Sequence, residues 1–252
     1  MASQDHHQSL EDRVVLVTGA ARRIGAALVR GVHRQGANVV IHFGNSREAA
    51  ESLAAELDAD RPGSVATIQA DLLDPSAPAR LVDEAIRAFS GLDVLMNNAS
   101  TFYPTPVGSI EERVWTDLVG TNLKAPLFLA QAAAPHLRRR NGSIVNMVDI
   151  HARHPLPNHP VYSAAKAGLA ALTLALAADL GPEVRVNGIA PGAILWPEGE
   201  QDLQAQQTIL DQTCLGRTGQ AQDIVDCALY LLSAGYVTGQ IIAVDGGRSI
   251  GW

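Results

Sequence analysis

The sequence is poor in features that would point to a disulfide-stabilised or nucleic-acid-binding protein. It has two cysteines in 252 residues, Cys214 and Cys227, which do not form a Cys-x-x-Cys pair. We therefore expect reduced thiols rather than a disulfide framework or a thiolate metal site. Positive charge is also scarce, because 19 Lys and Arg stand against 26 Asp and Glu, a formal net charge of -7. No overall basic footprint predicts nucleic-acid binding.

Long hydrophobic runs are scarce as well. Residues 1–12 are polar and lack the apolar core of a signal peptide, so we expect a flexible tail. The most apolar stretch, residues 164–180, is short for a membrane span and carries Lys166, Thr173 and Asp179. These features predict a cytoplasmic protein without a membrane segment.

Short apolar runs alternate with helical patterns along the rest of the chain, in which 47% of residues are hydrophobic. Runs that are apolar throughout fit strands buried on both faces of a parallel sheet. The expected strands are residues 14–17, 38–41, 65–68, 94–96, 143–148, 184–189 and 241–244. The expected helices are residues 24–35, 46–58, 77–89, 110–139, 161–180, 200–211 and 223–233. This alternation predicts one α/β domain over residues 13–252, a Rossmann-type, doubly wound, seven-stranded parallel sheet with helices on both faces.

A turn of small residues, TGAARRIG at residues 18–25, connects the first strand to the first helix. Small residues allow the backbone to approach a pyrophosphate, and a helix N-terminus favours its negative charge. The alternative is a tight turn that binds nothing, but the strand-turn-helix context favours a dinucleotide site.

The second expected strand ends in VIHFGNSR, residues 40–47, with no acidic residue at its tip. An acidic residue there would bind the ribose 2′-hydroxyl of NAD and repel a 2′-phosphate. Its absence, with Arg23, Asn45, Ser46 and Arg47 nearby, favours NADPH. Taken alone, Arg47 is equally consistent with a solvated charge at the start of a helix.

Tyr162 and Lys166 are four residues apart in an expected helix, so they lie on the same face. A neighbouring ammonium stabilises phenolate, so we expect a lowered Tyr162 pKa that suits proton transfer. A packed tyrosine beside a surface lysine is the alternative.

Together these segments resemble the short-chain dehydrogenases, with Arg23 at the middle glycine of a TGxxxGxG turn. Asp71-Leu72, the Asn97–Ser100 segment NNAS and Asn122 match further family positions in order. The resemblance implies that Asn122, Tyr162 and Lys166 are catalytic. It also implies a cofactor site formed by Gly19, Arg23, Ile24, Gly25, Phe43, Asn45, Ser46, Asp71, Leu72, Asn98, Ala99, Ser100, Tyr162, Lys166, Pro191 and Gly192.

The family usually has a serine 13 residues before its tyrosine, but this chain has Asp149. A carboxylate would repel the charge that develops on a carbonyl oxygen, whereas it suits a substrate with ring nitrogens. We therefore expect Asp149 to be catalytic and to relay a proton with Tyr162 to a ring nitrogen. Asp149 and its segment, residues 146–149 (NMVD), resemble the pteridine reductases, as do residues 98–106 (NASTFYPTP). That resemblance implies NADPH-dependent reduction of a dihydropterin or dihydrofolate by a homotetramer. It also implies a substrate site of Ser100, Phe102, Asp149 and Tyr162, in which Phe102 stacks on the pterin.

Two other functions are compatible with the sequence. One is a short-chain dehydrogenase for an alcohol or ketone, such as a sugar or a 3-oxoacyl compound, against which Asp149 argues. The other is an NADPH-binding sensor without activity, against which the intact Asn122, Tyr162 and Lys166 argue. His151, His154 and His159 lack metal-ligand spacing, so we expect no metal and place them in a loop beside the substrate.

Overall fold

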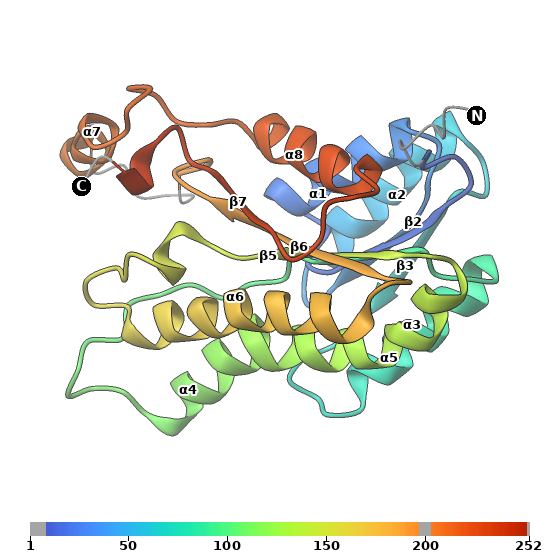
Figure 1. The fold of residues 1–252 in the computed structure, drawn as a ribbon, viewed down its shortest axis with the longest axis horizontal. Helices are drawn as coiled ribbons and strands as arrows, with labels where there is room; N and C mark the ends of the chain where they lie inside the picture. Colours follow the sequence, from blue (N-terminus) through green and yellow to red (C-terminus); the bar gives the residue numbers. More distant parts are fainter. Residues whose placement is uncertain (1–8, 197–202, 251–252) are drawn as a thin grey trace.

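The computed structural model describes residues 9–196 and 203–250, which form the predicted doubly wound sheet (Figure 1). The seven strands are all parallel, in the order β3-β2-β1-β4-β5-β6-β7. Their bounds are β1 (Val14–Val17), β2 (Asn38–Phe43), β3 (Val65–Gln69), β4 (Val94–Asn97), β5 (Ser143–Met147), β6 (Arg185–Pro191) and β7 (Ile241–Val244).

Helices cover both faces of this sheet, and each face has its own apolar core (Figure 1). One layer contains α1 (Arg23–Arg34), α2 (Arg47–Asp60) and α8 (Ala221–Ser233). The other contains α3 (Ala77–Phe89), α4 (Glu112–Val119), α5 (Ala125–Arg139) and α6 (Pro160–Leu180). Because side chains alternate across a strand, β1 contributes Val15 and Val17 to the first core and Val14 and Leu16 to the second.

The helix predicted over residues 110–139 is interrupted in the structure. A π-helical segment, η1 (Gly120–Lys124), separates α4 from α5. Periodicity alone does not reveal such a segment, since apolar residues continue on both sides of it. The helix predicted over residues 200–211 appears as α7 (Leu203–Asp211); its predicted start, like residues 1–8 of the tail, lies outside the described residues.

Helix α6 is longer than the apolar stretch read from the sequence. With 21 residues it is long and apolar enough to cross a membrane by length and composition, so the expectation that it is too short was wrong. It packs against β6 and α5, and it buries Lys166 and Thr173. We therefore interpret α6 as a core helix of this fold.

The strand order reverses between β1 and β4, the two strands whose connections run to opposite sides of the sheet. In an open parallel sheet, a crevice forms outside the carboxyl ends of the strands at this point. The loops after β1, β4, β5 and β6 therefore meet at one edge, beside α7 (Figure 1).

Candidate active site

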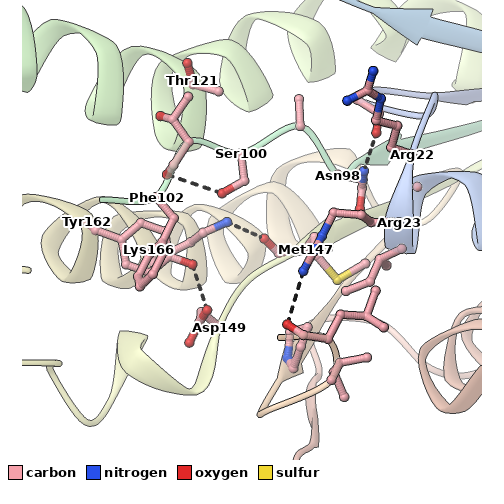
Figure 2. A pocket seen from close by; sticks show the side chains of 18 of the residues that line it. Arg22, Arg23, Asn98, Ser100, Phe102, Thr121, Met147, Asp149, Tyr162 and Lys166 are labelled. Atoms are coloured by element: carbon pink, nitrogen blue, oxygen red, sulfur yellow. Dashed lines mark hydrogen bonds between the residues drawn. The ribbon is translucent and has the colours of Figure 1, made fainter. Parts of the chain in front are cut away.

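A cavity of about 1070 Å³ occupies the carboxyl edge of the sheet. It extends from the turn after β1 to the start of α6, and it brings Asp149, Tyr162 and Lys166 together (Figure 2). Most of the positions predicted to bind cofactor or substrate line it: Gly19, Arg23, Ile24, Gly25, Asn45, Asp71, Leu72, Asn98, Ala99, Ser100, Phe102, Asp149, Tyr162, Lys166, Pro191 and Gly192.

The turn after β1 is fastened to the end of β4 by backbone and side-chain hydrogen bonds. Thr18 Oγ1 accepts from the backbone N–H groups of Asn98 and Ala99, each at 3.0 Å. The Asn98 amide donates to the carbonyls of Thr18, at 2.9 Å, and Gly19, at 3.0 Å. A Cβ atom on Gly25 would lie 2.3 Å from the Gly19 oxygen, so only glycine permits this packing. The turn is therefore preformed.

His42 also holds this turn, and it was not predicted. Its Nδ1 accepts from the Gly19 N–H at 3.1 Å, so its Nε2 carries the hydrogen donated to the Ala70 carbonyl, also at 3.1 Å. Burial lowers the pKa of His42 to about 4, although the Ala70 bond acts in the opposite direction. A histidine inside the apolar strand β2 was the available sequence signal. Neutral His42 connects β1, β2 and β3 beneath the turn.

Arg23 lines the cavity and also binds the protein's own backbone. Its guanidinium donates to the carbonyls of Leu195, at 3.1 Å, and Trp196, at 3.2 Å, across the cavity (Figure 2). These donors bind the segment after β6, and the cofactor contact implied for Arg23 stays a prediction. Its neighbour Arg22 is exposed, lines the cavity, and has no hydrogen-bond or ion-pair partner for its guanidinium among residues 9–196 and 203–250. Sequence reasoning passed over Arg22.

The end of β2 meets the cavity through fewer residues than predicted. Asn45 lines it, but the cofactor candidates Phe43 and Ser46 do not. Phe43 is buried in the core, and Ser46 precedes α2. Arg47 stacks over the Phe43 ring at 5.6 Å and forms an ion pair with Glu51 at 3.3 Å. Arg47 therefore contacts its own helix and Phe43, which agrees with the alternative of a solvated charge at the start of a helix.

Asp149 and Tyr162 form a short hydrogen bond beside Lys166 (Figure 2). Tyr162 Oη donates to Asp149 Oδ2 at 2.7 Å, while Asp149 Oδ1 accepts from the His151 N–H at 2.8 Å. Lys166 Nζ is buried and donates to the Met147 carbonyl at 2.8 Å. Asp149 lies just after the end of β5, and Tyr162 and Lys166 lie on one face of α6.

The prediction of a lowered Tyr162 pKa was wrong. Burial raises the pKa of Tyr162 well above its usual value of 10.0, and the charge and hydrogen bond of Asp149 raise it further. Lys166 Nζ lies 5.7 Å from the ring centroid of Tyr162, and the pKa is raised despite this neighbouring charge. Burial lowers the pKa of Lys166 to about 8, against a smaller opposing effect of Asp149. At neutral pH the tyrosine is therefore protonated and the lysine charged.

Asn122 supports the cavity wall without lining it. It is fully buried in η1, and its amide donates to the carbonyls of Thr101 and Leu118, each at 2.9 Å. Its oxygen accepts from Ser100 Oγ at 2.7 Å. The π-helical segment thus places a side chain that fixes the loop after β4, including the predicted substrate residue Ser100.

Phe102 belongs to an aromatic cluster at the mouth of the cavity. Its ring stacks on His159 with centroids 4.7 Å apart and planes inclined by 9°, and it meets the Tyr162 ring edge-on at 4.8 Å. Phe102 lines the cavity and is 52% exposed, whereas His159 does not line it. The phenylalanine therefore offers a flat apolar surface next to Tyr162.

A buried polar chain fixes α6 against the sheet. The Asn97 amide donates to Asn146 Oδ1 at 2.8 Å, and the Asn146 amide donates to Thr173 Oγ1 at 2.9 Å. The chain joins β4, β5 and α6, the elements that carry the loop with Ser100, Asp149 and the Tyr162–Lys166 pair. It therefore fixes the positions of the reactive groups relative to one another.

A family model described as enoyl-(acyl carrier protein) reductase matches residues 19–249. The chain belongs to the short-chain dehydrogenase/reductase family. Members of this family are NAD(P)-dependent oxidoreductases, and the preformed turn at one end of the cavity suits a dinucleotide. A dinucleotide bound in this cavity would have its phosphates held by the turn residues.

Relatives within the family act on different compounds. Pteridine reductase 1 of Leishmania tarentolae is 37% identical, over 94% of this chain and 96% of the relative. A Rhizobium meliloti (strain 1021) protein assigned as the galactose dehydrogenase GalD is also 37% identical, over 94% and 95%. The crystal structure of a Sinorhizobium meliloti 1021 protein assigned as a short-chain alcohol dehydrogenase superposes with a TM-score of 0.90. It is 32% identical, covering 95% of this chain and 97% of that one. These relatives share the family with this chain, but they do not share one substrate.

Proposed function

We propose that this short-chain dehydrogenase/reductase is an NADPH-dependent reductase of a pterin or folate, converting a dihydro form to the tetrahydro form at a C=N bond. The observation that carries the proposal is the 2.7 Å hydrogen bond between Tyr162 and Asp149. A carboxylate at that position would oppose negative charge on a carbonyl oxygen, but it can accept a hydrogen bond from a ring N–H. The likeness to pteridine reductase 1 supports the same substrate class.

Reduction of a C=N bond adds a hydride to carbon and a proton to nitrogen. NADPH supplies the hydride when bound. Tyr162 donates its proton in a hydrogen bond to Asp149, and we propose that the two side chains form a relay that protonates the ring nitrogen. The pair then takes a proton from water in the cavity, which restores its starting state. Charged Lys166 stabilises the pair while it is one proton short.

Phe102 supports a planar substrate. Its exposed ring is fixed edge-on to Tyr162, so a flat heterocycle that stacks on Phe102 lies beside the proton donor. The preference for NADPH rests on the end of β2, where no acidic side chain lines the cavity, and on the guanidinium of Arg22. A guanidinium binds a phosphate through two hydrogen bonds and suits the 2′-phosphate.

We also propose that the protein is a cytoplasmic homotetramer. Apolar side chains remain exposed on α4, α5 and α6 and would be covered in an assembly of subunits. They are Trp115, Leu127, Phe128 and Leu174. Light scattering at micromolar concentration tests this part: we expect a tetramer, and a monomer alone contradicts it.

Initial rates over a panel of substrates test the proposed activity. The panel pairs NADPH with dihydrofolate, dihydrobiopterin and dihydromonapterin, and sets beside them an acetoacetyl thioester and galactose with NADP⁺. We expect turnover with the pteridines and little with the carbonyl and sugar substrates. The reverse pattern favours a dehydrogenase for alcohols or ketones, and NADPH binding without any turnover favours a sensor.

A further inference from the structure

Arg248 is a buried cation on the wall of the cavity that plays no part in the mechanism above. It begins the short 3-10 segment η3 (Arg248–Ile250), which follows β7 at the end of the described chain. Its side chain lines the cavity although the residue is only 8% exposed. Guanidinium groups are seldom buried to this extent without an electrostatic reason.

The backbone around Arg248 is a built turn. The Asp245 carboxylate accepts from the N–H groups of Gly247, at 2.9 Å, and Ser249, at 2.7 Å. Gly247 has a φ of +80°, and a Cβ atom there would lie 2.8 Å from the Cβ of Cys214. This turn is therefore fastened to the segment after α7, and it sets the position from which the Arg248 side chain enters the cavity.

Charges at the substrate end of the cavity act on this guanidinium. Burial lowers the pKa of Arg248, and the negative charges of Asp149 and then Asp245 act in the opposite direction. The guanidinium remains protonated at physiological pH, because arginine does not lose its proton in proteins. The same end of the cavity thus contains a hydrogen-bond acceptor, Asp149, and a group that can only donate, Arg248.

We propose that Arg248 binds an oxygen acceptor of the substrate, while Asp149 receives its N–H groups. This rests on the proposed reduction of a pterin or folate. Such a substrate offers two kinds of oxygen, the oxo group of the ring and the carboxylates of a folate tail. Either kind of oxygen can accept hydrogen bonds from a guanidinium and is attracted by its positive charge.

Binding measurements on the complex with NADP⁺ separate the two kinds of oxygen. Calorimetry would compare the parent protein with Arg248→Met and Arg248→Lys for dihydrofolate, dihydrobiopterin and 2,4-diaminopteridine. Dihydrofolate has the oxo group and carboxylates, dihydrobiopterin has the oxo group alone, and the diamino compound has neither. Ser249→Ala is the matched control, because Ser249 lies in the same turn but does not line the cavity.

We expect Arg248→Met to weaken the binding of both oxo compounds at least about tenfold, to leave the diamino compound as tight or tighter, and to leave NADP⁺ unaffected. Arg248→Lys should recover part of the loss, and Ser249→Ala should behave as the parent does. Weakening confined to dihydrofolate would assign Arg248 to the carboxylates.

Equal affinities of Arg248→Met and the parent for all three ligands would overturn the inference. So would an equal loss for every ligand and NADP⁺, because that pattern indicates a packing role. If the parent protein binds none of the pteridines, the proposed function itself fails. Parent data therefore test the substrate class, and the difference between parent and variant tests Arg248.

Discussion

The phenolic oxygen of Tyr162 lies 2.7 Å from Asp149 Oδ2, and this contact adds to the effect of burial in keeping the tyrosine protonated. Burial raises the pKa of Tyr162, and the charge and hydrogen bond of Asp149 raise it further, so Tyr162 carries its proton at neutral pH. A protonated Tyr162 is the state that our proposed proton donation to the substrate requires.

Replacing Tyr162 with phenylalanine should remove the proton donor while keeping the ring beside Phe102. Loss of a positioned acid typically lowers the rate about 10²–10⁴-fold, so kcat should fall in that range. The affinity for NADPH, measured by fluorescence titration, should stay within about threefold, as expected for a change that removes one hydroxyl far from the phosphate turn. A kcat near that of the parent would show that another group supplies the proton.

The rate should depend on pH through Lys166, whose pKa is lowered to about 8. Lys166 carries its charge below that pH and loses it above, so kcat/KM should fall as the pH rises through about 8. Steady-state rates between pH 6 and 10 would show this alkaline limb. Lys166→Arg retains the charge throughout this range, so in that variant the limb should disappear even if the rate is lower. If kcat/KM still falls at the same pH in Lys166→Arg, a group other than Lys166 titrates there.

His42 should make the protein less stable in acid. Its pKa is about 4 in the folded protein and 6.5 when exposed, so the unfolded chain takes up the proton first. The stability that neutral His42 contributes is complete above pH 6.5 and is lost as the pH falls towards 4, by about 3 kcal/mol at 1.36 kcal/mol per pKa unit. Urea unfolding of the parent and His42→Gln at pH 7 and pH 4.5 measures it. We expect the free energy of unfolding to fall less between pH 7 and pH 4.5 in the variant than in the parent. An equal fall in both proteins would assign the acid sensitivity to other groups.

Much of the fold followed from the sequence, because seven apolar runs and the helical patterns between them are local signals. The position of the carboxyl edge, and hence the meeting of the turn after β1 with Asp149 and Tyr162, followed from parallel topology. What the sequence did not reveal depends on long-range contacts. The pKa of Tyr162 depends on burial and on a residue 13 positions away, and the contact of Arg23 with Trp196 spans 173 positions.

Arg22 and Arg23 are neighbours with different surroundings, so they form a matched pair. Arg22→Ala should lower kcat/KM for NADPH at least about tenfold, about 1.4 kcal/mol of transition-state stabilisation, and leave that for NADH nearly unchanged. Arg23→Ala should affect both cofactors alike, because it releases the segment that contains Leu195 and Trp196. Equal use of NADH and NADPH by the parent protein would contradict the cofactor preference altogether.

We propose that Asp149 adapts this site to a pterin or folate, and turnover of Asp149→Ser tests this most directly. Serine removes the carboxylate and keeps a small hydroxyl beside Tyr162, so dihydropterin reduction should fall about 10²–10⁴-fold. A parallel fluorescence titration should find NADPH binding nearly unchanged, which shows that the variant is folded. The variant is also expected to accept a simple ketone better than the parent does. If Asp149→Ser reduces dihydropterin at close to the parent rate, Asp149 is a packing residue and the account is wrong.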